Sequence, residues 1–215
     1  MVHKKLHIPI VTLDETFNAW ALAHVNAEII ETSLPDIKRT QHQASRTVWE
    51  SGYSYFLLRD KNNKEFIEFP DYIQTICQKA VEALSQETGR TLTRPDAFTN
   101  CIVSKYKKGE YLDYHRDISR AHHRYNGRDL NFYLGEQVIG VVLRAETGKH
   151  GARLCLQPPE NGKAPIYNYK SALQIPEENG TVFLLEGDAR NEWYHGVKDG
   201  RGQRISLTFR TIEFV

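Results

Sequence analysis

Residues 204–210 read RISLTFR, and this stretch alternates polar and apolar side chains in the manner of a β-strand. Side chains of a strand point alternately to its two faces, so the apolar residues share one face and Arg204 and Arg210 share the other. A guanidinium group in a protein interior needs an anion beside it, because burying an unpaired charge is costly. That anion is either a bound dicarboxylate or a carboxylate of the chain, for which Glu186 and Asp188 are candidates.

The composition is that of one ordinary domain. The chain has 215 residues, of which 40% are hydrophobic, so a sizeable core can form. The net charge of +1 disfavours a strongly basic nucleic-acid binder but leaves room for local basic patches. Three cysteines without CxxC spacing argue against a disulfide framework and a thiolate zinc site. We find neither a leader nor a membrane segment in the sequence, and expect a cytoplasmic protein, with the nucleus as the alternative and no membrane partner.

The N-terminal part, residues 1–99, predicts a helical or mixed extension that packs on the rest of the chain. A capping pattern at residues 12–15 begins one helix, whose apolar spacing continues to about Leu34. A second helix begins after Pro70 and ends at Gly89, because proline suits a helix start and glycine a helix end.

The segments between these helices are less regular. Residues 36–50 are polar and predict a short helix or a loop, whereas residues 53–58 predict a buried strand and residues 60–65 a turn.

From residue 100 onward, short alternating stretches are separated by turn residues. The predicted strands cover residues 100–106, 111–116, 137–144, 152–157, 165–169, 181–186, 193–197 and 204–213. Many short strands with turn signals between them predict a double-sheet barrel or jelly roll. We therefore expect an α+β protein with a mainly β core in residues 100–215, which form one compact domain with the extension. Residues 118–135 are predicted to be a mobile loop over the functional site.

His115 and Asp117 are one residue apart, so on a strand both side chains point the same way. Together with His195 on a later strand they make a set of two histidines and one carboxylate. This facial triad suits non-heme Fe(II), because three coordination positions stay open. A 2-oxoacid can occupy two of them, and Arg204 is placed in sequence to meet its far carboxylate. The competing interpretation is a surface pair with an unrelated core histidine.

Four motifs in order resemble the AlkB-like family of Fe(II)/2-oxoglutarate dioxygenases. They are NCIVSKYKKGE at 100–110, HRD at 115–117, WYHGV at 193–197 and RISLTFR at 204–210. The HxD pattern alone is weakly specific, whereas the four motifs in this order are strongly specific. The resemblance covers residues 100–212, about the C-terminal half of the chain.

The resemblance implies a double-stranded β-helix, a cupin-like form of the jelly roll, with flanking N-terminal helices. It implies that His115, Asp117 and His195 bind Fe(II), with 2-oxoglutarate as cosubstrate, O₂ as oxidant and ascorbate as the reductant in assays.

The cosubstrate residues follow from the same resemblance. Arg204 would form a salt bridge with a carboxylate of 2-oxoglutarate, Arg210 would make a second contact, and Tyr106 would donate a hydrogen bond. Ser104 and Ser206 stand where many DNA-repair members have asparagine. Serine still offers a donor and an acceptor, so both remain candidate cosubstrate residues.

The substrate implied by the resemblance is an N-alkylated nucleobase in single-stranded or duplex DNA or RNA, which would be hydroxylated and demethylated. Basic and tyrosine residues interleaved between Ser104 and Arg128 agree with a nucleic-acid partner. Ile118 and Ser119 depart from members that carry a further acid after HxD. This departure and the near-neutral charge favour one alternative, a protein or small-molecule hydroxylase on the same scaffold. A second alternative is a non-catalytic binding module that keeps the fold, against which the intact triad and Arg204 argue. The sequence leaves the oligomeric state open.

Overall fold

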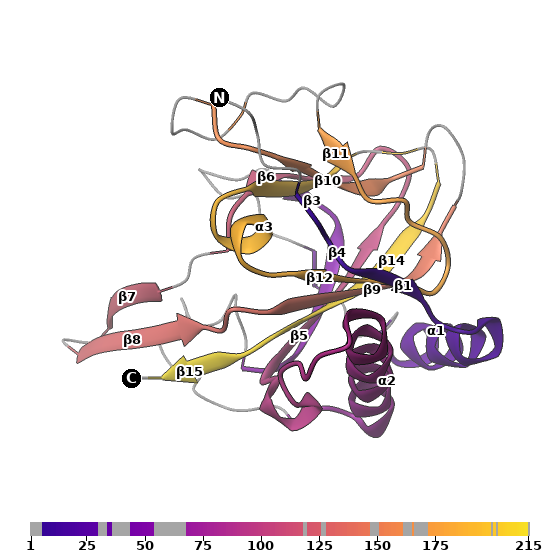
Figure 1. The fold of residues 1–215 in the computed structure, drawn as a ribbon, viewed down its shortest axis with the longest axis horizontal. Helices are drawn as coiled ribbons and strands as arrows, with labels where there is room; N and C mark the ends of the chain where they lie inside the picture. The colour runs from indigo at the N-terminus through magenta and orange to yellow at the C-terminus, as the bar shows by residue number, and fades with distance from the viewer. Residues whose placement is uncertain are drawn as a thin grey trace.

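The protein folds as two facing β-sheets and a smaller third sheet, with the two long helices on one side of the larger sheet, as Figure 1 shows for the computed structural model. The structure describes residues 6–29, 34–35, 44–53, 68–117, 120–125, 128–146, 151–160, 165, 172–198, 200 and 202–214. In this part of the chain, no helix has the length and apolar character that a membrane crossing requires.

The larger sheet has seven strands. In spatial order they are β1 (Ile10–Thr12), β12 (Thr181–Leu185), β9 (Val138–Ala145), β14 (Arg204–Arg210), β5 (Asn100–Tyr106), β4 (Thr47–Gly52) and β2 (Leu34–Pro35). All neighbouring strands in it are antiparallel. Because β1, β4 and β2 come from the N-terminal part, that part completes the sheet rather than only packing on it. The domain boundary after residue 99 stays a prediction.

The second sheet has five strands and a third has three. The second consists of β11 (Leu173–Gln174), β10 (Arg153–Gln157), β13 (Tyr194–Lys198), β6 (Tyr111–His115) and β3 (Ala44–Ser45). The third consists of β15 (Ile212–Phe214), β8 (Arg128–Leu134) and β7 (Arg120–Tyr125). The helices are α1 (Glu15–Ile29), α2 (Asp71–Thr88), the 3-10 turn η2 (Pro95–Ala97) and the short α3 (Asp188–Asn191).

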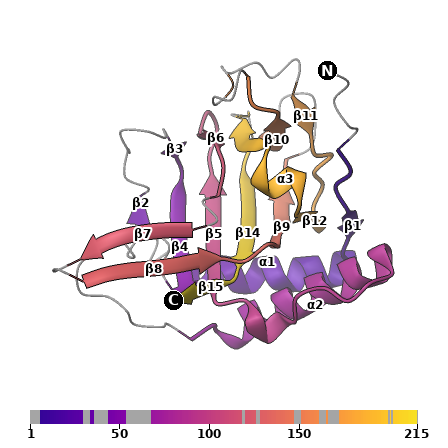
Figure 2. The ribbon, with the colours of Figure 1, turned by 60° about the vertical axis from the view of Figure 1, so that its left-hand side comes forward.

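Two apolar clusters explain this layering. One joins α1 and α2 to the outer face of the large sheet, where Ile205, Leu207 and Phe209 of β14 point. Figure 2 shows both helices running along this side of the sheet. The other lies between the two sheets and includes Tyr106 of the large sheet and Leu156 of the second. The alternation predicted for residues 204–210 is therefore confirmed.

The helix ends follow from local chemistry. The backbone N–H of Phe17 donates to the side chain of Asp14 over 2.7 Å, so Asp14 caps α1 rather than Thr12 of the predicted pattern. Helix α2 starts after Pro70 and ends at Gly89, whose φ of 66° lies in the left-handed region that glycine favours. Both ends of α2 confirm the prediction.

Three sequence predictions about secondary structure were wrong. Helix α1 ends at Ile29 and does not reach Leu34, which pairs in β2. Residues 36–50, expected to be a helix or loop, include most of β4, which pairs with β5 over its whole length. Residues 118–135, expected to be a loop, contain the β7–β8 hairpin. For β2 and β4, a partner strand supplies hydrogen bonds that no local pattern reveals.

The other predictions are confirmed in part. The predicted strands at 100–106, 111–116, 137–144, 152–157, 181–186, 193–197 and 204–213 match β5, β6, β9, β10, β12, β13 and β14 with β15, to within a residue or two at most ends. The predicted strands at 53–58 and 165–169 and the turn at 60–65 lie largely or wholly outside the described residues. The α+β class with a mainly β core is confirmed.

Candidate iron and 2-oxoglutarate site

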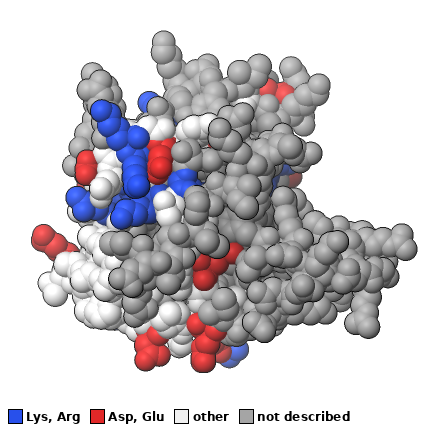
Figure 3. All heavy atoms as spheres, turned by 180° about the vertical axis from the view of Figure 1, so that it is seen from behind, with Lys and Arg blue, Asp and Glu red and all other residues white. Residues whose placement is uncertain are grey.

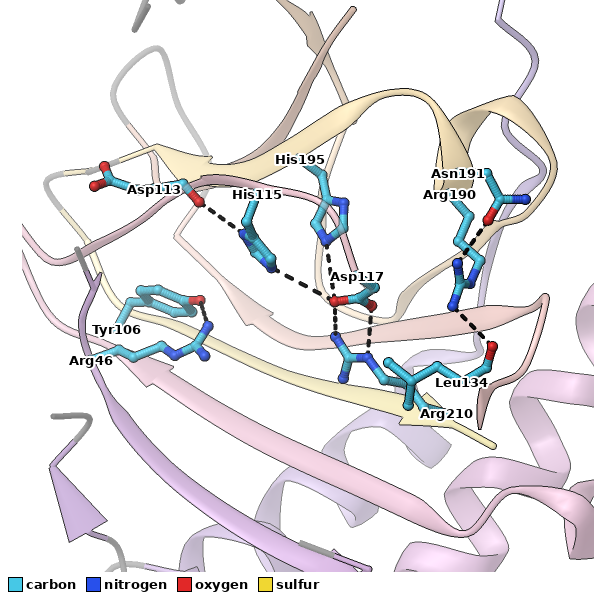
Figure 4. A network of polar contacts seen from close by, with 10 residues as sticks. All are labelled: Arg46, Tyr106, Asp113, His115, Asp117, Leu134, Arg190, Asn191, His195 and Arg210. Carbon is cyan, nitrogen blue, oxygen red and sulfur yellow. Dashed lines mark hydrogen bonds and ion pairs between the residues drawn. The ribbon is translucent and has the colours of Figure 1, made fainter. Parts of the chain in front are cut away.

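Three potential metal ligands meet in the structure: His115, Asp117 and His195 (Figure 4). Their ligand atoms all lie within 4.8 Å of one another. Nε2 of His115 lies 3.8 Å and Nε2 of His195 lies 4.0 Å from Oδ1 of Asp117. Two imidazoles and one carboxylate that converge in this way can take one face of a metal ion and leave the opposite face open, as Fe(II) oxygenases require.

The pairing of β6 with β13 brings the two histidines together. The register places His195 directly opposite His115, and it shifts after His195. Gly196 lets the strands approach closely, since a Cβ at this position would lie 2.7 Å from the carbonyl oxygen of Leu112. Asp117 lies two residues beyond the end of β6 and not on the strand. Its carboxylate nevertheless faces both histidines, so the HxD pattern identified this ligand although Asp117 does not lie on the strand.

The protonation states of the three groups suit metal binding. Burial, together with the neighbouring His195, lowers the pKa of His115 to about 3. Burial also lowers the pKa of His195. Burial alone would raise the pKa of Asp117, but the charge and hydrogen bond of Arg210 hold it below its usual range. At neutral pH the site therefore holds two neutral imidazoles and one carboxylate, which need not release protons when they bind a metal ion.

Backbone contacts orient one of the two imidazoles. Nδ1 of His115 lies 2.9 Å from the carbonyl oxygen of Asp113, to which it donates when the ring is neutral, so Nε2 keeps its lone pair for a metal ion. Nδ1 of His195 is buried and has no hydrogen-bond partner among the described residues.

Arg210 contacts the carboxylate of the triad. Its Nε donates to Oδ2 of Asp117 over 2.8 Å, and Nη2 lies 3.5 Å from Oδ1. The arginine thus fixes the orientation of a candidate metal ligand and stabilises its charge. Its expected contact with the cosubstrate stays a prediction.

Arg204 is buried at the start of β14, and the anion beside it is Glu177. Nε and Nη2 of Arg204 donate to the two carboxylate oxygens over 2.8 and 2.7 Å, and Nη1 donates to Oγ of Ser206 over 2.6 Å. Burial alone would lower the pKa of Arg204, but the charge and hydrogen bonds of Glu177 outweigh burial and raise it. The sequence suggested Glu186 and Asp188 as the carboxylates beside this arginine. This suggestion was wrong, since Glu177 fills that role and Glu186 pairs with Arg90.

The remaining predicted cosubstrate residues lie next to Arg204. Ser104 of β5 is the register partner of Ser206 of β14. The ring of Tyr106 lies 5.4 Å from the guanidinium carbon of Arg204, and its hydroxyl accepts a hydrogen bond from Nη1 of Arg46 over 2.9 Å. All five predicted cosubstrate residues are thus on the inner face of β5 and β14. Their roles in binding stay predictions.

Sequence reasoning missed three charged residues of the site. Glu177 and Arg46 reach it from segments with no recognisable motif, and fully buried Arg190 donates to the carbonyl oxygen of Leu134 over 3.1 Å. Figure 4 shows Arg46 and Arg190 on opposite sides of the triad. No local signal identifies them, because each depends on how distant segments pack. Residues 118–119, where the sequence departs from the family, lie outside the described residues.

A family model for the 2OG-Fe(II) oxygenase superfamily matches residues 22–210. The chain belongs to this superfamily. It is also similar to alpha-ketoglutarate-dependent dioxygenase alkB homolog 3 of Rattus norvegicus, with 38% identity over 110 residues, or 42% of this chain and 36% of that protein. The Mus musculus homologue gives the same identity and covers 37% of its own length. The chain thus spans little more than a third of the length of these relatives.

Solved structures support the fold. The structure of OsALKBH1 matches 96% of this chain and 100% of its own chain, with a TM-score of 0.60 and 16% sequence identity. A Pseudomonas putida prolyl-4-hydroxylase matches 95% of this chain and 91% of its own, with a TM-score of 0.56 and 14% identity. These likenesses confirm the double-stranded β-helix, and the curated relatives confirm the resemblance to AlkB-like dioxygenases.

The chemistry of the superfamily uses Fe(II), 2-oxoglutarate and O₂, and the residues present fit the metal ion. The convergent nitrogen and oxygen atoms of the triad are a donor set that non-heme Fe(II) takes. Arg204 is of the right chemistry for the cosubstrate carboxylate, but in this structure an internal carboxylate already binds it.

Proposed function

We propose that this protein is a dioxygenase that uses Fe(II), 2-oxoglutarate and O₂ to remove N-alkyl groups from nucleobases in DNA or RNA. One observation carries the proposal: the triad of His115, Asp117 and His195 lies in a double-stranded β-helix whose β14 supplies Arg204 and Arg210. Membership of the superfamily supports the reaction type. The resemblance of the motifs to AlkB-like dioxygenases supports the substrate class.

Each residue of the site has a distinct task in this reaction. Bound Fe(II), with 2-oxoglutarate and O₂, supplies the oxidation of a C–H bond of the substrate. The triad holds the metal ion, and Arg210 keeps the carboxylate of Asp117 in place. Arg204 and Ser206 orient the far carboxylate of the cosubstrate. Hydroxylation of an N-methyl carbon is followed by loss of formaldehyde, which leaves the demethylated nitrogen.

A basic residue beside the triad supports a nucleic-acid substrate. Arg116 lies between two of the ligands in sequence and is exposed, and its guanidinium carbon lies 4.9 Å from the ring centroid of Tyr194. An exposed arginine held on an aromatic ring can contact a phosphate or stack on a base. Figure 3, which shows the molecule from behind relative to Figure 1, shows Lys and Arg side chains gathered in one area of that face.

The test is succinate formation from 2-oxoglutarate with Fe(II), ascorbate and O₂, with and without N-methylated DNA and RNA oligonucleotides. We would compare the wild type with His115→Ala and with His7→Ala, a matched change at an exposed histidine. We expect one of the oligonucleotides to stimulate turnover with release of formaldehyde. We expect His115→Ala, but not His7→Ala, to lose this turnover.

Two results would refute parts of the proposal. Succinate formation that no methylated oligonucleotide stimulates, with no salt-dependent binding of nucleic acid, would refute the substrate class and leave a protein or small-molecule hydroxylase. Absence of turnover in a protein that binds the metal ion, under all of these conditions, would refute the reaction.

A further inference from the structure

The carboxylate of Glu177 binds Arg204 in the arrangement that a carboxylate of the cosubstrate would otherwise have. Both side chains are almost completely buried, with 3% and 1% of their surface exposed. The carboxylate of Glu177 accepts hydrogen bonds from Nε and Nη2 along one edge of the guanidinium, so both carboxylate oxygens are hydrogen-bonded. Such side-by-side bonding is the geometry in which arginine binds a carboxylate most strongly.

The rest of the guanidinium leaves little room for a second anion. Nη1 already donates to Ser206, which shares the inner face of β14 with Arg204. A carboxylate added at the remaining edge would place two buried negative groups on one positive group. Like charges at close range in a buried site repel strongly, so the two carboxylates compete for Arg204.

Displacement of Glu177 from Arg204 would require its side chain, and not its backbone, to move. Glu177 lies in the connection between β11 and β12, and hydrogen bonds hold this connection on both sides. The N–H of Ile175 donates to the carbonyl oxygen of Leu154 over 3.0 Å, and the side chain of Asn179 accepts from the N–H of Ala145 over 2.8 Å. The backbone is therefore anchored, whereas the glutamate has three rotatable side-chain bonds.

We propose that Glu177 lowers the affinity of the site for 2-oxoglutarate, and with it the preference for 2-oxoglutarate over 2-oxoacids with one carboxylate, because its carboxylate occupies the place on Arg204 that the far carboxylate of a 2-oxoacid needs. The inference rests on the proposed function. A 2-oxoacid with two carboxylates, bound to the metal ion at one end, displaces Glu177 with the other. A 2-oxoacid with one carboxylate has no group that can displace it. The glutamate thus lowers the affinity for 2-oxoglutarate.

The test is isothermal titration calorimetry of 2-oxoglutarate into the full chain loaded with Mn(II). Glu177→Gln keeps the size of the side chain and removes its charge, and we expect it to bind 2-oxoglutarate about tenfold more tightly than the wild type. Glu178→Gln, a change of the same kind at the exposed neighbour, is expected to match the wild type. Pyruvate, which has no far carboxylate, is expected to bind the wild type and Glu177→Gln equally.

Two further variants keep the inference falsifiable. Arg204→Met is expected to weaken binding of 2-oxoglutarate and leave pyruvate unaffected. If Glu177→Gln unfolds, which a thermal melt would show, Glu177→Asp takes its place. The shorter acid cannot hold the same two bonds, so it too is expected to bind 2-oxoglutarate more tightly.

The outcomes separate the inference from the function on which it rests. If Glu177→Gln, or Glu177→Asp in its place, binds 2-oxoglutarate no more tightly than the wild type while Arg204→Met binds it weakly, Glu177 only orients the arginine and the inference is overturned. If neither the wild type nor any variant binds 2-oxoglutarate, or if Arg204→Met binds it as the wild type does, the proposed role of Arg204 in cosubstrate binding is refuted. Succinate formation by the wild type then decides whether the proposed function also fails.

Discussion

Gly196 is the position where a single methyl group should disturb the metal site without touching a ligand. It follows His195 on β13 and faces the backbone of β6, the strand that ends at His115. A Cβ built at this glycine would lie 2.7 Å from the carbonyl oxygen of Leu112 and 3.1 Å from the backbone of Asp113. These neighbours are backbone atoms of a paired strand, so no side chain can swing away to make room.

The size of the effect follows from these distances. Gly196→Ala requires the two strands to separate by roughly 0.7 Å to restore ordinary contact, and overpacking of this kind costs about 1–3 kcal/mol. At about 2–4 °C for each kcal/mol in a protein of this size, the melting temperature should fall by about 2–12 °C. The separation also exceeds the tolerance of about 0.5 Å within which a functional site holds its geometry. We expect the affinity for the metal ion to fall about 10–100-fold, as when a residue that supports a metal ligand is removed.

The assay pairs a thermal melt of the metal-free protein with titration of Mn(II). Gly89→Ala is the matched control, because the left-handed backbone makes alanine cost about 1–2 kcal/mol there while nothing lies within 4 Å of the added Cβ. It should lose stability and keep its metal affinity. Gly196→Ala with metal affinity equal to that of the wild type would refute the reasoning that the close approach of β6 and β13 sets the ligand geometry.

Three other outcomes are expected. Arg210→Met leaves the buried carboxylate of Asp117 without its cation, so urea denaturation should show a loss of about 3–5 kcal/mol in the metal-free protein. Saturating Mn(II) should restore part of the loss, and an equal loss with and without Mn(II) would contradict the charge argument. Chelation should lower the melting temperature, since a metal ion at 100 times its Kd adds about 2.7 kcal/mol; no change on chelation would show that the folded protein binds no metal ion. Burial raises the pKa of Cys77 to about 12, that of Cys155 to about 11 and that of Cys101 as well. At pH 8 the native thiols should therefore react with Ellman's reagent far more slowly than the urea-unfolded thiols, and equal rates would contradict their burial.

Local patterns in the sequence predicted the elements that are regular and strongly amphipathic. The two faces of β14 follow from its alternation alone, because a strand with one face on the helices and the other on the site must separate apolar from polar side chains. The bounds of α2 follow from Pro70 and Gly89, which act on the backbone within a few residues. His115, Asp117 and His195 could be named from their motifs, because iron chemistry requires these residue types.

The polar strands could not be predicted in this way. β4 and β7 have few apolar residues in alternation, and they are strands because other strands pair with them. For β4 that partner is β5, which lies about fifty residues away in the chain. Hydrogen bonds between distant segments form only once the rest of the sheet is in place, so they leave little trace in the local sequence.

The sequence by itself determined that Arg204 needs an anion, and left open which one. The tertiary structure decided that this anion is Glu177, although the two residues are 27 positions apart. The physical reason is that a buried charge must be neutralised by whichever opposite charge the fold brings within reach. The amino-acid types establish that requirement, whereas the path of the chain between β11 and β12 selects the residue that meets it.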